Sequence, residues 1–497
     1  MPNTIFCACS HAVQKLNNNA AVFCTNRFCA VLFVIIVAFF IYCIGIERES
    51  IWHDEWCTIN VIEQPTFSAF MQELIRTENN PPLYYLLLRA WTLNGKYTSP
   101  VHIRLLSALF AAITVGLTFY FAGLISTNAA GWIAASIAAT SPYMCWYAQE
   151  ARNLSLSACM TLLCIITFYR FAVKPDSKIR LFEVALCMLL GIFSHYFIVF
   201  LIPAQLFLCW CFQEKTFFRK WVIILIPACL LFLLWIPCLK GQLDDFHTEW
   251  LGKPSLFFLW GMLRFFTGGL YYSSYPMLSL VAALLTGGFF LYGSIKALAE
   301  KSHTKETLYP LIFFIILLII PLFISYFKPI LFQGRRYLIY ILPLFFIITA
   351  HGIYCMRTKC FRFIILSIVI GIQFYGDYQM VRFKQKRQWD SAAQAISKYS
   401  IPGDAVFSAD YTNGSILSYY GIGCAELCVI PDMSVYETSL ERYNRLWFVT
   451  FIQQCPYQTF FNRKYKKLRE KTFYSHGGFV VRLILYDLRD SSHNLAH

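Results

Sequence analysis

Long runs of apolar residues, separated by short polar gaps, make up the chain as far as about residue 378. A helix needs roughly 20 apolar residues to cross a hydrocarbon core about 30 Å thick. The pattern therefore predicts a polytopic α-helical membrane protein. We expect eleven spans, near residues 28–46, 102–125, 131–146, 153–171, 181–194, 197–213, 221–238, 276–297, 309–327, 337–355 and 363–378.

The apolar segment Pro82–Trp91 is too short to span a bilayer. It follows two asparagines and a proline, which favour a helix start. We predict an amphipathic helix lying in the membrane interface, within an external loop of residues 47–101. The alternative is a further spanning helix, but it would place the later basic gaps alternately on the two sides of the membrane.

The basic residues predict the orientation of these spans. Every long inner gap then carries Lys or Arg, as the positive-inside rule requires. The N-terminus is accordingly expected in the cytoplasm, and an odd number of spans places the C-terminal tail outside. These gaps contain Lys174, Lys178, Arg180, Lys215, Arg219, Lys220, Lys296, Lys301, Lys305, Arg357, Lys359 and Arg362.

The polar tail after the last span is long enough for a small domain. We therefore divide the chain into a membrane module, residues 1–378, and an external α/β domain, residues 379–497. The tail shows helical spacing and then three short strand patterns, at Trp389–Tyr399, Asp404–Ser408, Leu446–Phe451 and Phe479–Tyr486. Its cysteines Cys424, Cys428 and Cys455 could pair in an oxidising compartment, and the sequence leaves the pairing open.

Composition supports membrane insertion and argues against nucleic acid. Of 497 residues, 58% are hydrophobic and only 14% are charged, which is too apolar for a soluble protein. The net charge of +15 comes mainly from the short gaps between apolar blocks. It is therefore a topology signal, with anionic membrane lipid as a secondary partner.

The candidate chemistry centres on Ile51–Thr58, where Asp54 and Glu55 stand between two tryptophans just after the first span. This arrangement puts carboxylates at the bilayer surface beside aromatic anchors. Ordinary interfacial loop charges are the alternative. Further ionisable residues fall near the outer face in this topology, where charges usually have partners: Arg89, Arg104, Glu150, Arg152, His195, Arg335 and Arg336.

The order and spacing of several motifs resemble the GT-C superfamily of membrane glycosyltransferases. The similarity is greatest to the branch with protein O-mannosyltransferases and lipid A aminoarabinose transferases, and it covers nearly the whole chain. One departure is Asn80, where the family usually has His, which leaves no imidazole at this position. The motifs are Asp54 with Glu55, residues 80–88, Arg104 with the four residues after it, residues 141–152, residues 194–196, Arg336 with Tyr337 and Leu338, Pro343, and residues 388–393.

The resemblance implies a donor in which the sugar is linked to a polyprenyl phosphate, with transfer on the outer face. Because the leaving group is already a phosphate ester, it needs no general acid, and one base suffices. This differs from glycoside hydrolysis, in which two carboxylates divide the work. We assign the base to Asp54, which would deprotonate an acceptor hydroxyl and lead to inversion at the anomeric carbon.

The departing phosphate requires fixed cations, and the planar fork of Arg suits phosphate oxygens. The expected phosphate-binding residues are Arg104, Arg335, Arg336 and Tyr337, with Arg89 and Tyr84 as further candidates. The alternative for Arg335 and Arg336 is snorkelling of their side chains to the interface.

In this resemblance Glu150 is the second acid, which orients the acceptor or helps hold a cation. The alternative is an ion pair with Arg152 that stabilises a helix start. His195, beside Tyr196, is as compatible with an interfacial structural role as with ligand binding. No His or Cys cluster has metal spacing, so the sequence leaves a divalent cation open.

The leading hypothesis is thus an inverting glycosyltransferase, resident in the bacterial inner membrane, that acts on a glycolipid, lipid A, a cell-wall polymer or a protein. The alternative is a transporter or flippase of lipid-linked sugars. Transporters tend to show internal repeats and charges near the midplane, whereas the charges here gather toward one face. A non-catalytic scaffold is a third possibility, which leaves Asp54, Glu150 and Arg336 without a purpose.

Overall fold

The computed structural model describes residues 27–212, 215–244, 253–255, 257–269, 275–299, 305–328, 335–408, 411–427, 440–451 and 455–489. Its contacts divide the chain into two units. The bundle unit comprises residues 1–44, 71–91 and 104–377, and the sheet unit comprises residues 45–70, 92–103 and 378–497. Each unit is therefore assembled from segments that are far apart in the sequence.

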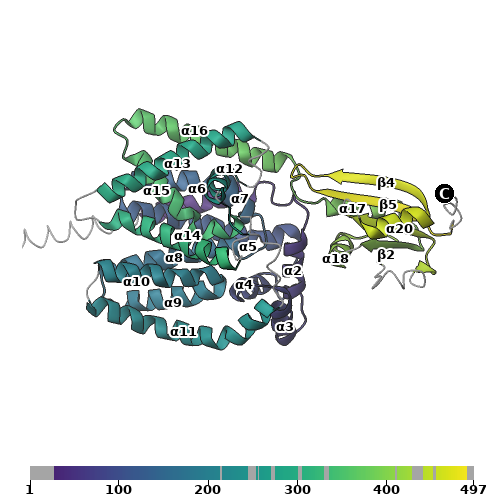
Figure 1. Ribbon diagram of the computed structural model, residues 1–497, viewed down its shortest axis with the longest axis horizontal. Helices are drawn as coiled ribbons and strands as arrows, with labels where there is room; N and C mark the ends of the chain where they lie inside the picture. Colours follow the sequence, from purple (N-terminus) through teal and green to yellow (C-terminus); the bar gives the residue numbers. More distant parts are fainter. Residues whose placement is uncertain are drawn as a thin grey trace, which may run out of the picture. The chain divides into compact units, whose positions relative to one another are not determined.

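The bundle unit is helical, and its helices run largely alongside one another, as α9, α10 and α11 do in Figure 1. Three helices, α3, α5 and α16, contain residues of both units. In chain order the elements are Arg27–Cys43, α3 (Phe67–Thr77), α4 (Leu83–Trp91), α5 (Pro100–Ile125), α6 (Asn128–Ala139), α7 (Pro142–Ala148), α8 (Leu154–Val173), α9 (Lys178–Ser194), η1 (Tyr196–Phe200), α10 (Leu201–Phe212), α11 (Lys215–Asp244), α12 (Phe258–Gly268), α13 (Pro276–Ala299), η4 (Lys305–Thr307), α14 (Leu308–Phe327), η5 (Arg335–Ile341), α15 (Leu342–Tyr354) and α16 (Lys359–Arg382).

Among the described residues, seven helices are long and apolar enough to cross a membrane. Two shorter apolar helices, Arg27–Cys43 and Tyr196–Trp210, coincide with further predicted spans. The chain is therefore a largely helical protein with multiple potential membrane spans. The seven long segments are Pro100–Ile125, Leu154–Val173, Phe217–Gln242, Pro276–Ala299, Leu308–Phe327, Arg336–Tyr354 and Lys359–Arg382.

The segment predicted as one span, residues 131–146, is instead two helices, so this prediction is wrong. α6 has 12 residues and rises only about 18 Å. The chain breaks at Thr140 and Ser141, because the Ser141 hydroxyl accepts the Met144 N–H and Pro142 occupies the first turn of α7. A Ser cap followed by Pro is a helix-start signal that the apolar run obscured.

Close packing of α13 on α15 is possible because each helix has a glycine at the crossing. A Cβ atom on Gly293 would lie 2.3 Å from the Ile348 carbonyl oxygen, and one on Gly352 would lie 2.1 Å from the Phe289 oxygen. Side chains at either position would push the helices apart. Beside the crossing, the rings of Phe290 and Phe345 stack with centroids 5.1 Å apart.

The short apolar segment after Asn80 forms α4, whose nine residues confirm that it is too short to span. Its buried side chains include Tyr84, Tyr85 and Arg89. α12, with 11 residues, is likewise too short to span.

The sheet unit contains a five-stranded sheet in the order β2-β1-β3-β5-β4 (Figure 1). β2, β1 and β3 are parallel, whereas β5 is antiparallel to both β3 and β4. Each element predicted in the tail is present within one residue. The strands are β1 (Asp404–Ser408), β2 (Glu426–Leu427), β3 (Arg445–Thr450), β4 (Lys466–Tyr474) and β5 (Val480–Asp487), and the helices are α17 (Trp389–Tyr399), α18 (Tyr411–Tyr420) and α20 (Pro456–Lys464).

Helices cover both faces of this sheet. α17 and α18 pack against one face, in a cluster that includes Trp389, Trp447 and Leu483. α20 packs against the other face through Phe461, close to Phe448. β4 was missed in the sequence because it is an exposed edge strand whose first six residues are mostly charged.

The loop after the first helix belongs to this sheet unit. The Glu49 carboxylate accepts the backbone N–H groups of Gln385 and Lys386, at 2.7 and 2.9 Å. The Ile51 N–H donates to the Tyr420 hydroxyl at 2.7 Å, and the Asp390 N–H donates to Ser50 Oγ at 3.2 Å. These bonds hold the start of α2 (His53–Ile62) against the C-terminal tail.

Two of the three tail cysteines are described, and both are free thiols. Cys424 is exposed, whereas Cys455 is buried in the cluster around Phe461. Cys428 lies outside the described residues.

We predict that Asp404→Ala destabilises the sheet unit by about 3–5 kcal/mol, the usual cost of breaking a buried ion pair from one side. Asp404 is fully buried and accepts Arg445 Nε and Nη2, both at 2.7 Å, and Trp447 Nε1 at 2.9 Å. The measurement is thermal unfolding followed by tryptophan fluorescence. Lys467→Ala, which removes an exposed pair with Glu470, is the control and should change stability by less than about 1 kcal/mol. Equal losses of stability in the two variants would contradict a stabilising role for the buried ion pair of Asp404.

Candidate active site

Asn80 is the centre of a polar network in the bundle unit. Its side-chain oxygen accepts Asn153 Nδ2 at 3.1 Å, and its amide nitrogen donates to the Tyr85 hydroxyl at 3.4 Å. Its backbone carbonyl accepts Gln242 Nε2 at 3.1 Å. Through these bonds Asn80 connects the start of α4 with the start of α8 and the end of α11. An amide suits this position because it both donates and accepts.

The network continues to the turn between α9 and η1. Asn153 Nδ2 also donates to the Ser194 carbonyl at 3.0 Å. The Tyr196 hydroxyl donates to Gln242 Oε1 at 2.6 Å and accepts Trp235 Nε1 at 2.9 Å. Gln242 therefore joins the predicted residues Asn80 and Tyr196, and Asn153 joins Asn80 to Ser194. The sequence alone did not point to Gln242 or Asn153.

Arg152 pairs with Glu78, which the sequence analysis also missed. Arg152 Nη1 lies 2.5 Å from Glu78 Oε1, and both side chains are nearly buried. Glu78 stands two residues before Asn80, in the polar run that precedes α4, and this proximity is the signal that could have found it. The ion pair joins the segment before α4 to the segment between α7 and α8.

Three further predicted residues are buried charges in the same unit. Arg104 on α5 is fully buried, Arg89 on α4 is 8% exposed, and Glu150 is 1% exposed. One turn after Arg104, Ser107 Oγ is 2.8 Å from the Tyr84 hydroxyl and donates to the Arg152 carbonyl at 3.3 Å. Charges buried at this depth are costly and mark candidate functional positions.

His195 and Tyr337 form an aromatic pair beside this network, and Arg336 lies against Tyr337. Arg336 Nη2 donates to the Tyr337 hydroxyl at 3.1 Å, and the Tyr337 ring lies 6.2 Å from the His195 ring. His195 Nδ1 accepts the Phe197 N–H at 3.1 Å and caps η1. Arg335 begins η5, and its side chain lies outside the described part of the chain.

Asp54 and Glu55 both lie in the first turn of α2, in the sheet unit, but their surroundings differ. Glu55 is fully buried, with Oε2 3.5 Å from Lys386 Nζ. The Lys386 ammonium also lies 5.1 Å from the Trp52 ring centre. Asp54 is only partly buried. The predicted catalytic pair thus consists of one carboxylate held in an ion pair and one that is partly accessible.

The donor set does not suit a divalent cation at Glu55. The Lys386 ammonium stands next to this carboxylate and already supplies a positive charge, so a second cation would be repelled. In the described part of the chain, no group of three His, Cys, Asp or Glu residues could hold a metal ion.

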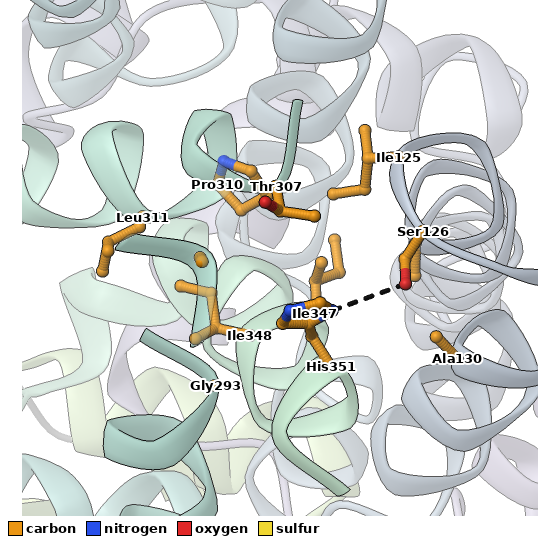
Figure 2. A pocket seen from close by; sticks show the side chains of 12 residues that line it. Ile125, Ser126, Ala130, Gly293, Thr307, Pro310, Leu311, Ile347, Ile348 and His351 are labelled. Carbon is orange, nitrogen blue, oxygen red and sulfur yellow. Dashed lines mark hydrogen bonds between the residues drawn. The ribbon is translucent and has the colours of Figure 1, made fainter. Parts of the chain in front are cut away.

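A small pocket lies elsewhere in the bundle unit, lined by α5, α6, α13, α14 and α15 (Figure 2). His351 projects into it, with Nδ1 3.4 Å from Ser126 Oγ. Its volume of about 10 Å³ is close to the room that one water molecule needs. This pocket is too small for a sugar.

No protein-family model matches the chain, and no curated protein sequence matches it. Solved structures do match. ArnT from Cupriavidus metallidurans in the apo state is 11% identical, with a TM-score of 0.58, over 92% of this chain and 98% of that one. ArnT bound to undecaprenyl phosphate is 12% identical, with a TM-score of 0.56, over 91% and 97% of the two chains.

The apo oligosaccharyltransferase of Archaeoglobus fulgidus is 11% identical, with a TM-score of 0.53, over 85% of this chain and 69% of that one. At such low identities these similarities show the fold alone. They confirm that the chain shares the fold of ArnT and of this oligosaccharyltransferase.

We predict strong coupling between Glu55 and Lys386. Either Glu55→Leu or Lys386→Leu leaves a buried charge without its partner and should destabilise the protein by about 3–5 kcal/mol. The double variant removes both charges, so it should lose less stability than the sum of the two single variants. Melting temperatures of the four proteins measure this coupling. If the stability losses of the two single variants simply add in the double variant, Glu55 and Lys386 do not stabilise the protein through their interaction.

We also predict a pH dependence from His195, which lies in the turn between two helices. Burial lowers the pKa of His195 from 6.5 to about 4. The unfolded chain therefore binds the proton more readily, and stability falls as the pH decreases from 6.5 toward 4. At pH 5 the loss should be about 2 kcal/mol relative to pH 7.5. His195→Asn provides an acceptor that does not titrate, and its melting temperature should fall less over this range. Parallel profiles would exclude His195 as the cause.

Proposed function

We propose that this protein is an inverting glycosyltransferase. It transfers a sugar from a polyprenyl-phosphate-sugar donor to a hydroxyl group of a glycolipid, lipid A, a cell-wall polymer or a protein. The main support is the GT-C fold shared with ArnT over 92% of this chain. One ArnT structure contains undecaprenyl phosphate, which is the kind of lipid phosphate that such a reaction releases.

In this proposal Asp54 is the general base. The acceptor hydroxyl loses its proton to the Asp54 carboxylate as its oxygen attacks the anomeric carbon, while the bond from that carbon to the phosphate oxygen breaks. Asp54 suits this role better than Glu55 because Glu55 is fully buried against Lys386. Glu55 instead fixes the first turn of the helix that carries Asp54.

Arginine side chains stabilise the phosphate that leaves with both bonding electrons. A guanidinium stays charged when buried and can bind two phosphate oxygens at once. We assign this role to Arg104, Arg335 and Arg336, with Arg89 in support. Two tyrosine hydroxyls, on Tyr84 and Tyr337, add neutral donors. Arg336 and Tyr337 are already hydrogen-bonded to each other, which holds the guanidinium in place.

The remaining predicted residues position these groups. Glu150 orients the acceptor hydroxyl, and Arg152, paired with Glu78, supports the segment that carries it. Asn80 and Tyr196 hold the starts of their helices through the shared network. His195 caps η1 and packs against Tyr337.

The proposed setting is the bacterial inner membrane, which the chain crosses several times. The N-terminus is cytoplasmic, and the C-terminal α/β domain and the reaction are on the periplasmic side. The support is the basic residues of the inner gaps together with the seven long apolar helices. The molecules that this protein binds are then the lipid-linked donor, the acceptor and membrane lipids.

We predict that Asp54→Asn lowers sugar transfer by a factor of about 10² to 10⁴, the usual contribution of a general base. The measurement is transfer of radiolabelled sugar from a panel of polyprenyl-phosphate-sugars to membrane extracts by the purified protein. Glu63→Gln, an exposed carboxylate at the end of the same helix, is the matched control and should keep its activity. Both variants should retain the wild-type melting temperature.

The same assay tests the flippase alternative. A flippase would consume no donor, and lipid-linked sugar would cross vesicle membranes equally well with wild type and with Asp54→Asn. That result, or full transfer activity in Asp54→Asn, would overturn the proposed mechanism.

A further inference from the structure

A groove of about 460 Å³ lies on the bundle unit between the helix Arg27–Cys43, α5 and α8. Its volume is within the usual range of about 300–1,000 Å³ for ligand pockets. Each helix contributes residues three or four positions apart, so each presents one continuous face. The lining includes Arg27, Leu117, Tyr120, Leu163, Ile166 and Arg170.

The groove is a true hollow rather than a flat lipid-facing surface. Its floor includes Ile166 and Thr167 of α8, which are 2% and 4% exposed. Its walls include the half-buried residues Leu117 and Leu163. Phe28 at the mouth is 63% exposed, so the groove opens sideways onto apolar surface from which a lipid chain can enter.

The polar groups of the groove gather at one end. Arg27 is the first described residue of its helix, Tyr120 stands in the last two turns of α5, and Arg170 stands in the last turn of α8. Arg27 is held in a fixed orientation, because its Nη2 donates to the Gly123 carbonyl at 2.9 Å and to Asn128 Oδ1 at 2.8 Å. The guanidinium also lies 5.9 Å from the Tyr120 ring centre.

The charge at this end is positive. The groove lining contains two arginines and no acid. Arg170 Nη1 lies 3.5 Å from Glu183, but Arg180 also donates to the Arg170 carbonyl, which brings a third guanidinium to this end. Glu183 beside Arg170 and Glu306 beside Tyr169 offset part of this charge, and the three guanidinium groups still outnumber these two carboxylates. An anionic headgroup would balance this charge, and a zwitterionic one would not.

This end of the bundle is remote from the candidate active site. Along α5, Tyr120 is 16 residues from Arg104, and along α8, Arg170 is 17 residues from Asn153. At 1.5 Å per residue both separations are about 25 Å, close to the thickness of a hydrocarbon core. The groove therefore meets the membrane surface opposite to the one that the active site faces.

We propose that this groove binds an anionic diacyl phospholipid, of the phosphatidylglycerol class, from the cytoplasmic leaflet. Arg27 and Arg170 bind the phosphate, and the Tyr120 hydroxyl adds a neutral donor. One acyl chain lies along Leu117, Leu163 and Ile166. The charge complementarity and the position remote from the active site favour a structural membrane lipid over the lipid-linked donor.

The test uses the purified full-length protein in neutral detergent, with its melting temperature measured as lipid is titrated. A ligand that binds only the folded state raises this temperature in proportion to its occupancy. Phosphatidylglycerol should stabilise the wild type, and phosphatidylcholine should have little effect. Arg170→Gln should raise the half-maximal phosphatidylglycerol concentration at least tenfold.

Two more variants complete the test. Leu117→Trp fills the groove while leaving its charges in place, and it should also weaken the lipid effect, even if Arg170→Gln fails to fold. Arg362→Gln is the control, because Arg362, like Arg27, binds a backbone carbonyl and lies over a tyrosine ring, but outside the groove. It should respond like the wild type.

Three results would overturn the proposal. One is equal stabilisation by phosphatidylglycerol and phosphatidylcholine. Another is an unchanged phosphatidylglycerol response in both Arg170→Gln and Leu117→Trp. The third is stabilisation by undecaprenyl phosphate but not by phosphatidylglycerol, which would assign the groove to a polyprenyl carrier.

Discussion

The cost of burying a charge or a polar group in an apolar protein is the constraint on which this structure depends. The apolar interior of the bundle unit offers polar side chains few hydrogen-bonding partners other than one another, so each must pair with a group inside the protein. Glu78 pairs with Arg152, and Asn80 joins Asn153 to Gln242. These bonds link the ends of several helices and therefore fix the loops that the proposed reaction uses.

The same constraint gives the two neighbouring carboxylates of α2 different roles. Adjacent residues on a helix point about 100° apart, so Asp54 and Glu55 cannot share one environment. Glu55 is buried with Lys386, while Asp54 keeps partial access to solvent. A structural acid thus holds the turn that carries the proposed catalytic one. This separation is a physical reason to assign a single base, as a donor with a phosphate leaving group requires.

The bundle unit also has two chemically different ends. One end holds the buried network around Asn80, and the other holds the cationic groove with Arg27 and Arg170. Long apolar helices such as α5 and α8 keep these ends apart. Under the two proposals, the protein binds two lipid phosphates at opposite membrane surfaces, one as a reactant and one as part of its membrane environment.

The sequence by itself determined the apolar helices, the short helix α4 and the order of helix and strands in the tail, because these features depend on local periodicity. It also supplied most candidate residues, because motifs are recognised by their order and spacing along the chain, which require no knowledge of contacts. It failed at the break before Pro142 and at the charged edge strand β4. Only the tertiary structure decided which charge meets which: Glu55 and Lys386 are 331 positions apart. No local pattern encodes such a partner, because the chain brings the two charges together only when it folds.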